Sequence, residues 1–422
     1  MNRTNPRSLN VAVTISHRPN HEGETGGLAG TWERITKVAA GRDDLRLTVF
    51  FLGDREEVRD PAPGVRHVLL PSFIGTERFP CFSAIPTHTD LTPLHPALFK
   101  RLQGFDVIHT TDTFYGYALT ALWRHRVSGT PLVTSMQTDA IGWARVYTPR
   151  ILPKVVPSPA LVDWLLNKAH LLDRQERSME GDLTRFLRGC AAVFISHDRD
   201  RERVQRLSPG TRVQFLRRGL DLSKFNPDRK DRDKLLEKFK IPGDRKLLLH
   251  VGRIDPVKGA MIAAKVVKGL LERGENVHLL MVGEGSQRSE VAALLGDRVT
   301  LTGNLPHDDL GWVYASCDLL LFPSEAEVWP NVFMEARACG LPVIGCEQAA
   351  MHLFRGYPDS AVLLPDRDEH RWLEAAIKLL HHPEQLEIIA KNARAAIEAM
   401  SPTWEDILER DLMPVWRTAA GR

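Results

Sequence analysis

Two acidic residues and a helix start lie close together in the stretch 322–344. An apolar strand is expected to end at Phe322, and a helix is expected to begin at Pro330, because proline suits the first helical position. Glu327 lies just before that helix, and Glu335 lies inside it. A helix N-terminus attracts anions, since its first N–H groups lack intrahelical partners. Carboxylates do not bind phosphate, so we expect both glutamates to accept hydrogen bonds from sugar hydroxyls beside it.

A second stretch, H-V-G-R-I-D-P-V-K-G at 250–259, supplies positive charge. It follows an expected strand over 246–251 and precedes a helix expected from about Val257. Arg253 and Lys258 therefore lie in a strand-to-helix loop, at the carboxyl end of a strand where open α/β sheets bind ligands. The planar fork of arginine and the point charge of lysine together suit a diphosphate.

These two stretches resemble the family 4 glycosyltransferases, which are retaining enzymes of the GT-B fold. The resemblance rests on G-R-x-x-x-x-K-G, on the E-x7-E spacing of Glu327 and Glu335, and on the trailing A-x-x-C-G-L-P-V-I. It extends over most of 217–364 and is looser in the N-terminal half. That half looks nearest to lipid-glycosylating members such as sulfoquinovosyl and mannosyl transferases.

The resemblance implies a role for each of these residues. Arg253, Lys258 and the helix N-terminus would neutralise the leaving diphosphate, Glu327 would hold the sugar, and Glu335 would hold the ribose. The catalytic set is thus Arg253, Lys258 and Glu327. The other donor contacts expected are Gly27, Gly252, Trp329, Asn331 and Val332. Family members usually have glycine where Pro330 stands, so one N–H donor is missing here and its neighbours must suffice.

A separate set of polar residues follows two expected strands of the N-terminal half. His109, Asp112, Gln137 and Asp139 would face the cleft and the acceptor. Many family members carry a histidine where this chain has Gln137, and an amide cannot exchange a proton near pH 7. His109 and Asp112 are the nearest alternatives, although a histidine that ends a strand is more often structural.

Regular alternation of strands and helices predicts an α/β protein with parallel sheets. Strands are expected over 9–16, 45–51, 67–70, 106–109, 131–135, 191–196, 213–216, 246–251, 277–282, 299–302, 318–322, 342–345 and 361–364. We expect the GT-B fold, with two Rossmann-like domains facing across a cleft. Residues 1–220 would bind the acceptor and 221–401 the nucleotide-sugar, and a C-terminal helix over 402–422 would cross back to the first domain.

Composition narrows the class of protein. The chain has 422 residues, enough for two domains, and its 43% hydrophobic and 26% charged content is ordinary for a globular protein. No apolar run approaches the roughly 18 residues that span a bilayer, and 11–15 reads as a strand rather than a signal peptide. Five cysteines without a C-x-x-C pair favour reduced thiols in a cytoplasm.

Several other classes of function are disfavoured. Gly26, Gly27 and Gly30 do not form G-x-G-x-x-G, which argues against a dinucleotide dehydrogenase. Three D-R-D triplets lie among further charges and are interpreted as solvated surface rather than a metal site. Neither a metal, a cofactor nor a nucleic-acid partner is expected.

Charge is distributed unevenly along the chain. Residues 1–220 hold 30 Lys/Arg against 22 Asp/Glu, a net of +8, whereas the whole chain carries +3. The stretch 144–188 mixes basic and apolar residues, which suits either an anionic membrane surface at the inner face or an amphipathic helix pair covering the sheet. A long loop is expected over 71–96, and it contains the apolar residues Phe73, Phe79, Phe82 and Ile85. They would line an acceptor groove or, as slightly favoured, pin the loop to the core.

The sequence therefore predicts a metal-independent retaining hexosyltransferase. A nucleoside diphosphate sugar, UDP in preference to GDP, would donate to a hydroxyl acceptor on a membrane lipid or a lipid-linked glycan. The alternatives are a nucleotide-sugar epimerase of the same fold and a non-catalytic nucleotide-sugar-binding subunit.

Overall fold

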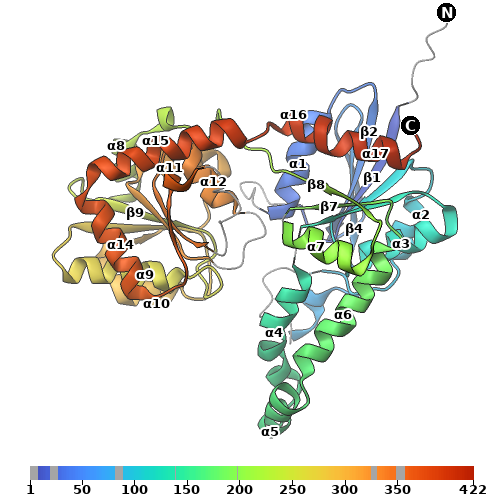
Figure 1. The fold of residues 1–422 in the computed structure, drawn as a ribbon, viewed down its shortest axis with the longest axis horizontal. Coiled ribbons are helices and arrows are strands. Elements are labelled where there is room, and N and C mark those ends of the chain that lie inside the picture. Colours follow the sequence, from blue (N-terminus) through green and yellow to red (C-terminus); the bar gives the residue numbers. More distant parts are fainter. Residues whose placement is uncertain are drawn as a thin grey trace, which may run out of the picture. The chain divides into compact units, whose positions relative to one another are not determined.

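The computed structural model describes residues 8–19, 27–80, 89–137, 139–196, 198–324, 330–347 and 357–422. The chain divides into two compact units, each described here by itself (Figure 1). Among the described residues, unit 1 comprises 8–19, 27–217 and 404–422, and unit 2 comprises 218–403. The last segment of the chain thus belongs to the same unit as the first.

Unit 1 is built on an eight-stranded sheet whose neighbours are all parallel except β3 and β4. Its order is β3 (Glu57–Ala62), β4 (Val65–Pro71), β2 (Leu45–Gly53), β1 (Leu9–Ile15), β5 (Val107–Thr110), β6 (Leu132–Met136), β7 (Ala192–Ile195), β8 (Arg212–Phe215). Strand order reverses direction between β1 and β5, so their carboxyl ends flank a topological switch point. β3 was not predicted, because this exposed edge strand carries polar residues and a proline.

Helices cover both faces of this sheet. They are α1 (Gly27–Ala39), α2 (Pro96–Arg101), α3 (Gly116–Ser128), α4 (Ala140–Val155), α5 (Pro159–Asp163), α6 (Leu171–Leu187), α7 (Asp198–Leu207), α16 (Trp404–Asp406) and α17 (Met413–Ala419). Alternation along β1 decides the faces: Val11 and Val13 pack with Trp32 of α1 and Trp416 of α17, whereas Ala12 packs with Tyr117 of α3.

The C-terminal segment is anchored to unit 1 by a buried carboxylate. Asp411 lies in a π-helical turn at Ile407–Leu412 and is 4% exposed. It accepts hydrogen bonds from the Arg217 backbone N–H (3.0 Å) and from the Arg217 guanidinium, Nη2 at 2.8 Å. Arg217 is the last residue of unit 1 before the chain enters unit 2, so this pair joins the departing and returning segments.

Unit 2 is built on a six-stranded parallel sheet that encloses one large core. Its order is β11 (Val299–Leu301), β10 (Val277–Val282), β9 (Lys246–Val251), β12 (Leu319–Phe322), β13 (Val343–Cys346), β14 (Val362–Leu364). The helices are α8 (Arg232–Phe239), α9 (Ala260–Glu272), α10 (Arg288–Leu295), α11 (His307–Ser316), α12 (Asn331–Ala338), α14 (Glu369–His381) and α15 (Pro383–Met400). The four inner strands are almost completely buried, as a parallel sheet with covered faces requires, and the edge strands β11 and β14 are half-buried.

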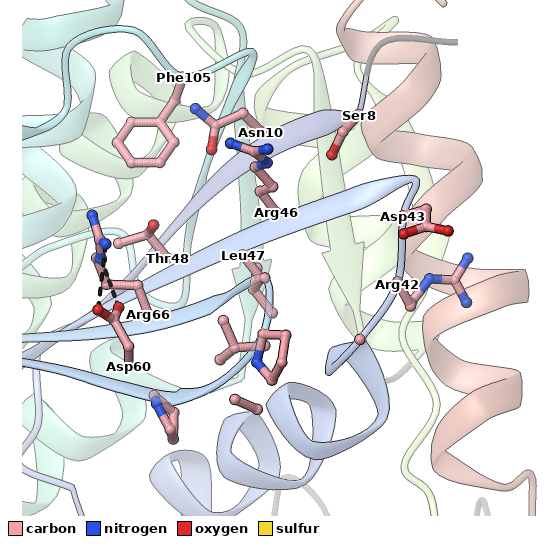
Figure 2. A pocket seen from close by; sticks show the side chains of 16 residues that line it. Ser8, Asn10, Arg42, Asp43, Arg46, Leu47, Thr48, Asp60, Arg66 and Phe105 are labelled. Carbon is pink, nitrogen blue, oxygen red and sulfur yellow. Dashed lines mark hydrogen bonds and ion pairs between the residues drawn. The ribbon is translucent and has the colours of Figure 1, made fainter. Parts of the chain in front are cut away.

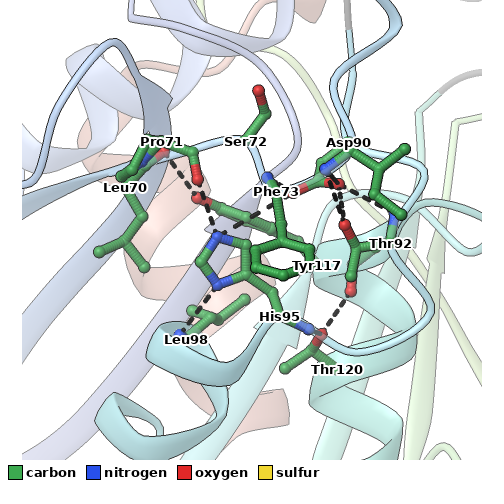
Figure 3. Close-up of polar contacts among 12 residues, drawn as sticks. Leu70, Pro71, Ser72, Phe73, Asp90, Thr92, His95, Leu98, Tyr117 and Thr120 are labelled. Atoms are coloured by element: carbon green, nitrogen blue, oxygen red, sulfur yellow. Dashed lines mark hydrogen bonds and ion pairs between the residues drawn. The ribbon is translucent and has the colours of Figure 1, made fainter.

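The loop after β4 is held by a second buried carboxylate, Asp90 (Figure 3). Asp90 accepts hydrogen bonds from the backbone N–H groups of Phe73 (2.8 Å), Ile74 (3.1 Å) and Thr92 (2.9 Å). Burial opposes ionisation, but these bonds and the Thr92 hydroxyl outweigh it, and the pKa of Asp90 lies below its usual value.

The predicted pinning of this loop by its aromatic residues is wrong for the two that are described. The side chains of Phe73 and Phe79 are 60% and 42% exposed, so a hydrogen-bonded carboxylate holds the loop in their place. Phe82 and Ile85 lie outside the described residues.

Helices α4 and α6 form a hairpin that extends away from the sheet, with α5 at its far end (Figure 1). Thr148 donates to Gln175 (2.8 Å), and Arg145 pairs with Glu176 (2.5 Å), which ties the two helices together. Only the base of the hairpin packs on the sheet, through Ile141, Leu183 and Leu187.

Replacing Asp411 with alanine should destabilise unit 1 by about 2–3 kcal/mol, because the partly buried Arg217 N–H loses its acceptor and the guanidinium loses its partner. In a domain of this size, this corresponds to a fall in Tm of roughly 4–12 °C, measured by thermal unfolding. The control is Arg410→Ala, which removes an exposed pair with Asp406 and should change stability by less than about 1 kcal/mol. Equal Tm values for the two variants would contradict the anchoring role.

Candidate active site

The carboxyl edge of the unit 2 sheet brings the predicted cationic loop against the exit of β12. Strands β9 and β12 are neighbours, so the loops that follow them meet. Gly259 marks the contact: a Cβ there would lie 2.6 Å from the Pro323 carbonyl oxygen. Its φ of +69° is a conformation that favours glycine. Gly259 also caps α9, which therefore begins at Ala260 rather than near Val257 as predicted.

Asp255 organises the cationic loop, a role that the sequence analysis missed. One carboxylate oxygen accepts from Arg253 Nε (2.8 Å), and the other accepts from the Lys258 backbone N–H (2.9 Å). One acidic side chain therefore holds the guanidinium of Arg253 and the backbone of Lys258. The sequence does contain a signal for this role, because Asp255 lies between the two cations and before a proline in G-R-I-D-P-V-K-G.

Two further glycines allow the loop after β10 to pack on the cationic loop. A Cβ on Gly283 would lie 2.1 Å from the Gly252 carbonyl oxygen, and one on Gly285 would lie 2.3 Å from that of Ile254. The backbones also exchange hydrogen bonds, including Ile254 N–H to the Glu284 carbonyl at 2.9 Å. These glycines were not among the predicted site residues, although V-G-E-G directly follows a strand.

Glu335 is nearly buried, at 6% exposure, and both of its carboxylate oxygens accept hydrogen bonds. His307 Nε2 lies 3.0 Å from one oxygen, and the Tyr314 hydroxyl donates to the other at 3.1 Å. Burial and the neighbouring carboxylate raise the pKa of Tyr314 well above its usual value, so it stays a donor. Two residues of α11 thus fix the orientation of this carboxylate.

The start of α12 differs slightly from the prediction. Pro330 is the N-cap residue, with φ −82° and ψ 78°, and the helix begins at Asn331. Asn331 and Val332 therefore occupy its first turn, where N–H groups lack intrahelical acceptors. Glu327 and Trp329 lie outside the described residues.

The carboxyl edge of the unit 1 sheet gathers buried polar groups at its switch point. Ser16 follows β1 and donates to the Asp112 carboxylate, which follows β5, at 2.6 Å. Burial raises the pKa of Asp112, although the bonds from Ser16 and the Tyr115 amide act in the opposite direction. Gln137 is 7% exposed and Ser196 is 5% exposed. Gln137 Oε1 and Ser196 Oγ have no hydrogen-bond partner in the described part of the chain.

The other predicted acceptor residues have different surroundings. His109 has the structural role that its position at a strand end favoured, rather than the alternative one in the cleft: it is completely buried, Trp416 Nε1 donates to its Nδ1 (3.1 Å), and its Nε2 lies 2.5 Å from Ser135 Oγ. Burial lowers its pKa to about 3. Asp139 caps α4 by accepting from the Gly142 N–H (3.1 Å) and pairs with Arg203 (3.4 Å). Gly27 begins α1.

A cavity of about 930 Å³ lies at the opposite, amino edge of the unit 1 sheet (Figure 2). Arg66, on its wall, is bound to Asp60 at 2.8 Å, and Arg42 is bound to Asp44. The cavity lies at the edge opposite to the carboxyl ends of β1, β5 and β6. None of the predicted site residues line it.

The D-R-D triplets lie at helix starts. Asp231 accepts from the Lys234 N–H (3.1 Å) and Asp368 from the Arg371 N–H (2.9 Å), while Asp198 and Asp200 lie in the first turn of α7. Within the described ranges, no group of three or more His, Cys, Asp or Glu side chains is placed to hold a metal ion. No helix there is both long and apolar enough to cross a bilayer.

A known protein family matches most of unit 2. Residues 231–396 match the family "Glycosyl transferases group 1". A D-inositol 3-phosphate glycosyltransferase of Thermobispora bispora is 26% identical over 92% of this chain and 90% of its own length. A GDP-mannose-dependent alpha-mannosyltransferase of Mycolicibacterium smegmatis is 29% identical over 80% and 79%, and the sulfoquinovosyl transferase of Arabidopsis thaliana is 25% identical over 77% and 60%.

Solved structures agree on the fold. Sucrose-phosphate synthase from Thermosynechococcus elongatus matches with a TM-score of 0.67 at 20% identity, over 94% of this chain and 96% of its own. HepE of Anabaena, solved with UDP and glucose, matches with a TM-score of 0.61 at 16% identity over 98% of both chains. The predicted GT-B fold class is confirmed.

Gly259→Ala should lower the stability of unit 2 by about 2–4 kcal/mol, because the new Cβ meets Pro323 and the left-handed backbone is strained. The matched control is Gly274→Ala, whose φ is +87° but whose Cβ would meet nothing within 4 Å. It should cost only the backbone strain, about 1–2 kcal/mol. Thermal unfolding checks the difference, and equal Tm losses would show that the two loops do not need this close contact.

Proposed function

The chain carries a group 1 glycosyltransferase domain, and from this premise we propose that it moves a sugar from a nucleoside diphosphate donor to a hydroxyl acceptor with retention of anomeric configuration. The supporting observation is the meeting of the Arg253–Lys258 loop with the exit of β12, at the edge where α12 begins. Residues 221–401 would bind the nucleotide-sugar, and 1–220 with 402–422 the acceptor.

In the proposed donor site, side-chain cations, helix N–H groups and loop backbone groups bind the diphosphate of the donor. Arg253, Lys258 and the first N–H groups of α12, including those of Asn331 and Val332, bind the diphosphate. Asp255 binds the Arg253 fork through Nε, and within the described residues no bond from its terminal nitrogens is recorded, so these nitrogens are proposed to bind phosphate oxygens. Backbone groups at Gly252 and Trp329 complete this part of the proposal.

The two carboxylates take the sugar moieties. Glu335 already accepts two hydrogen bonds, but an ionised carboxylate has about four lone-pair sites, so two remain for ribose hydroxyls. By family resemblance, Glu327 holds the transferred sugar. His307 and Tyr314 keep the Glu335 carboxylate in one orientation, which reduces the entropy lost when ribose binds.

Catalysis would result from stabilising the negative charge that develops on the leaving diphosphate. Negative charge grows on the diphosphate as the glycosidic bond breaks, so preorganised cations stabilise the transition state more than the ground state. In the proposed front-face path, the acceptor hydroxyl attacks from the side of the leaving group and passes its proton to a phosphate oxygen. Side-chain cations and the helix terminus supply the positive charge, so the proposal requires no metal ion.

The donor base is proposed to be uracil, with guanine as the alternative. The mycobacterial relative is named for GDP-mannose, so both nucleotides belong in any binding experiment. The acceptor is proposed to present its hydroxyl to the cluster of Ser16, Asp112, Gln137 and Ser196. The oxygen of Gln137 has no donor among the described residues, and an acceptor hydroxyl would supply one.

Lys258→Ala and Arg253→Ala should each lower kcat by about 10²–10³, as loss of one preorganised donor to a developing anion does. Transfer is measured in excess EDTA with UDP- and GDP-sugars and a lipid acceptor extract. Lys265→Ala is the control, because Lys265 lies on the neighbouring helix in an exposed pair with Glu369 (2.5 Å) and should leave kcat unchanged.

Three results would contradict the proposal. Near-wild-type kcat in both active-site variants would remove their assigned role. Conversion of the donor sugar without any acceptor would favour the epimerase, and nucleotide binding without turnover would favour a non-catalytic subunit.

We also propose that the far end of the α4–α6 hairpin rests on an anionic membrane at the cytoplasmic face. Val155, Leu161 and Trp164 are 59%, 45% and 53% exposed there. Between 150 and 168 the sequence has three basic residues and one acidic residue, a charge that suits anionic lipid. Such a position would support transfer to a lipid acceptor.

The double change Leu161→Ala with Trp164→Ala should weaken binding to phosphatidylglycerol vesicles by at least about tenfold, because two apolar side chains no longer enter the interface. Vesicle sedimentation measures this. Ile388→Ala in α15 is the control, since Ile388 is equally exposed, at 56%, but belongs to unit 2. Unchanged sedimentation of the double variant would exclude the hairpin as the contact.

A further inference from the structure

A third basic residue, Arg367, lies at the edge of the unit 2 sheet that holds the two predicted cations. It follows β14 and belongs to none of the motifs that carried the family resemblance. Its guanidinium is half-buried and donates to three backbone carbonyls. The bonds run from Nε to Pro323 (2.6 Å), from Nη1 to Pro256 (3.0 Å) and from Nη2 to Val257 (2.5 Å).

These carbonyls belong to the two loops that meet at Gly259. Pro323 leaves β12, whereas Pro256 and Val257 belong to the cationic loop after β9. The sheet order is β9, β12, β13, β14, so Arg367 reaches across β13 to join the exits of the other strands. With strands about 4.8 Å apart, β14 and β12 are separated by about 10 Å, a span that an extended arginine covers.

The bond to Val257 has a direct consequence for Lys258. The Val257 carbonyl and the Lys258 N–H belong to one peptide unit. Arg367 binds its C=O, and Asp255 binds its N–H at 2.9 Å. Both the C=O and the N–H of this peptide unit are therefore hydrogen-bonded to side chains. Because Asp255 also binds Arg253, a continuous chain of hydrogen bonds runs from Arg253 through the Lys258 peptide to Pro323.

A planar guanidinium suits this task better than an ammonium group. Its five N–H donors point in fixed directions, so three carbonyls can be bound in one geometry with little further loss of side-chain freedom. Two of the three acceptors belong to prolines, which have no N–H of their own with which to pair the loops. Charge-assisted bonds from Arg367 supply the missing link between them.

We propose that Arg367 is a positioning residue of the donor site. It fixes the peptide of Lys258 against the exit of β12, so that the two cations and the start of α12 grip one diphosphate together. The inference rests on the proposed function and adds to it a residue that does not touch the donor itself.

The test compares Arg367→Ala and Arg367→Lys with Arg371→Ala. Arg371 lies four residues further on in the first turn of α14, where it pairs with Asp366 at the surface, so it controls for loss of a nearby positive charge. Calorimetry with UDP, GDP and inorganic pyrophosphate measures affinity. Steady-state transfer gives kcat and KM.

In Arg367→Ala, affinity for UDP or GDP and for pyrophosphate should fall about tenfold or more. The value of kcat should fall about 10–100-fold, as a small misplacement of a catalytic group does. Arg367→Lys keeps the charge but loses the planar fork of the guanidinium. On a logarithmic scale, its affinity and kcat should therefore recover less than half of what Arg367→Ala loses. Ethylguanidinium at millimolar concentration should restore part of the activity of the alanine variant, whereas a purely structural defect would not respond.

The outcomes separate this inference from the function beneath it. If the wild type binds none of the three ligands and transfers no sugar, both the function and the inference fail. If the wild type binds and transfers, but Arg367→Ala keeps its affinity and kcat within about twofold, the inference alone is overturned. The same holds if Arg371→Ala loses as much as Arg367→Ala, or if lysine restores full activity.

Discussion

The candidate donor site depends on the close approach of two loops that follow neighbouring parallel strands. Because β9 and β12 pair directly, the chain leaves both at the same edge, and Gly259 lets one backbone touch Pro323 of the other. Any side chain at Gly259 would force the loops apart. The distance between the basic loop and the exit of β12 is thus set by packing within the sheet and by one missing Cβ.

Hydrogen bonds from side chains, both to the backbone and to one another, give this edge its order. Asp255 places Arg253 and Lys258, and three carbonyls are bound by Arg367. Glu335 is oriented from α11 by His307 and Tyr314. A proposed site for a charged ligand benefits from such an arrangement, because its cations are placed before the ligand arrives and less reorganisation is needed when charge develops.

The buried polar groups of unit 1 are of two kinds. His109, Ser135 and Trp416 satisfy one another inside the core, and Asp411 and Asp90 bind backbone N–H groups. By contrast, Gln137 Oε1 and Ser196 Oγ are buried at adjacent strand ends and have no hydrogen-bond partner among the described residues. Buried polar atoms without partners are costly, so their position at the carboxyl edge of the sheet, on one side of the switch point, supports the proposed acceptor site.

The sequence by itself determined the fold class and the identity of the basic loop. Alternating strand and helix periods, G-R-x-x-x-x-K-G, and the spacing of Glu327 and Glu335 are local patterns that a single chain displays. Local patterns do not state which strands become neighbours or which face of a strand meets a helix. Those depend on register and packing between residues far apart in sequence.

Only the tertiary structure therefore decided that His109 points into the core, that Phe73 and Phe79 are exposed, and that Asp255 and Arg367 hold one peptide between them. Arg367 lies 109 residues after Lys258, and no spacing rule connects them. Their meeting follows from the order β9, β12, β13, β14. The physical reason is that a parallel sheet brings the ends of distant strands to one edge.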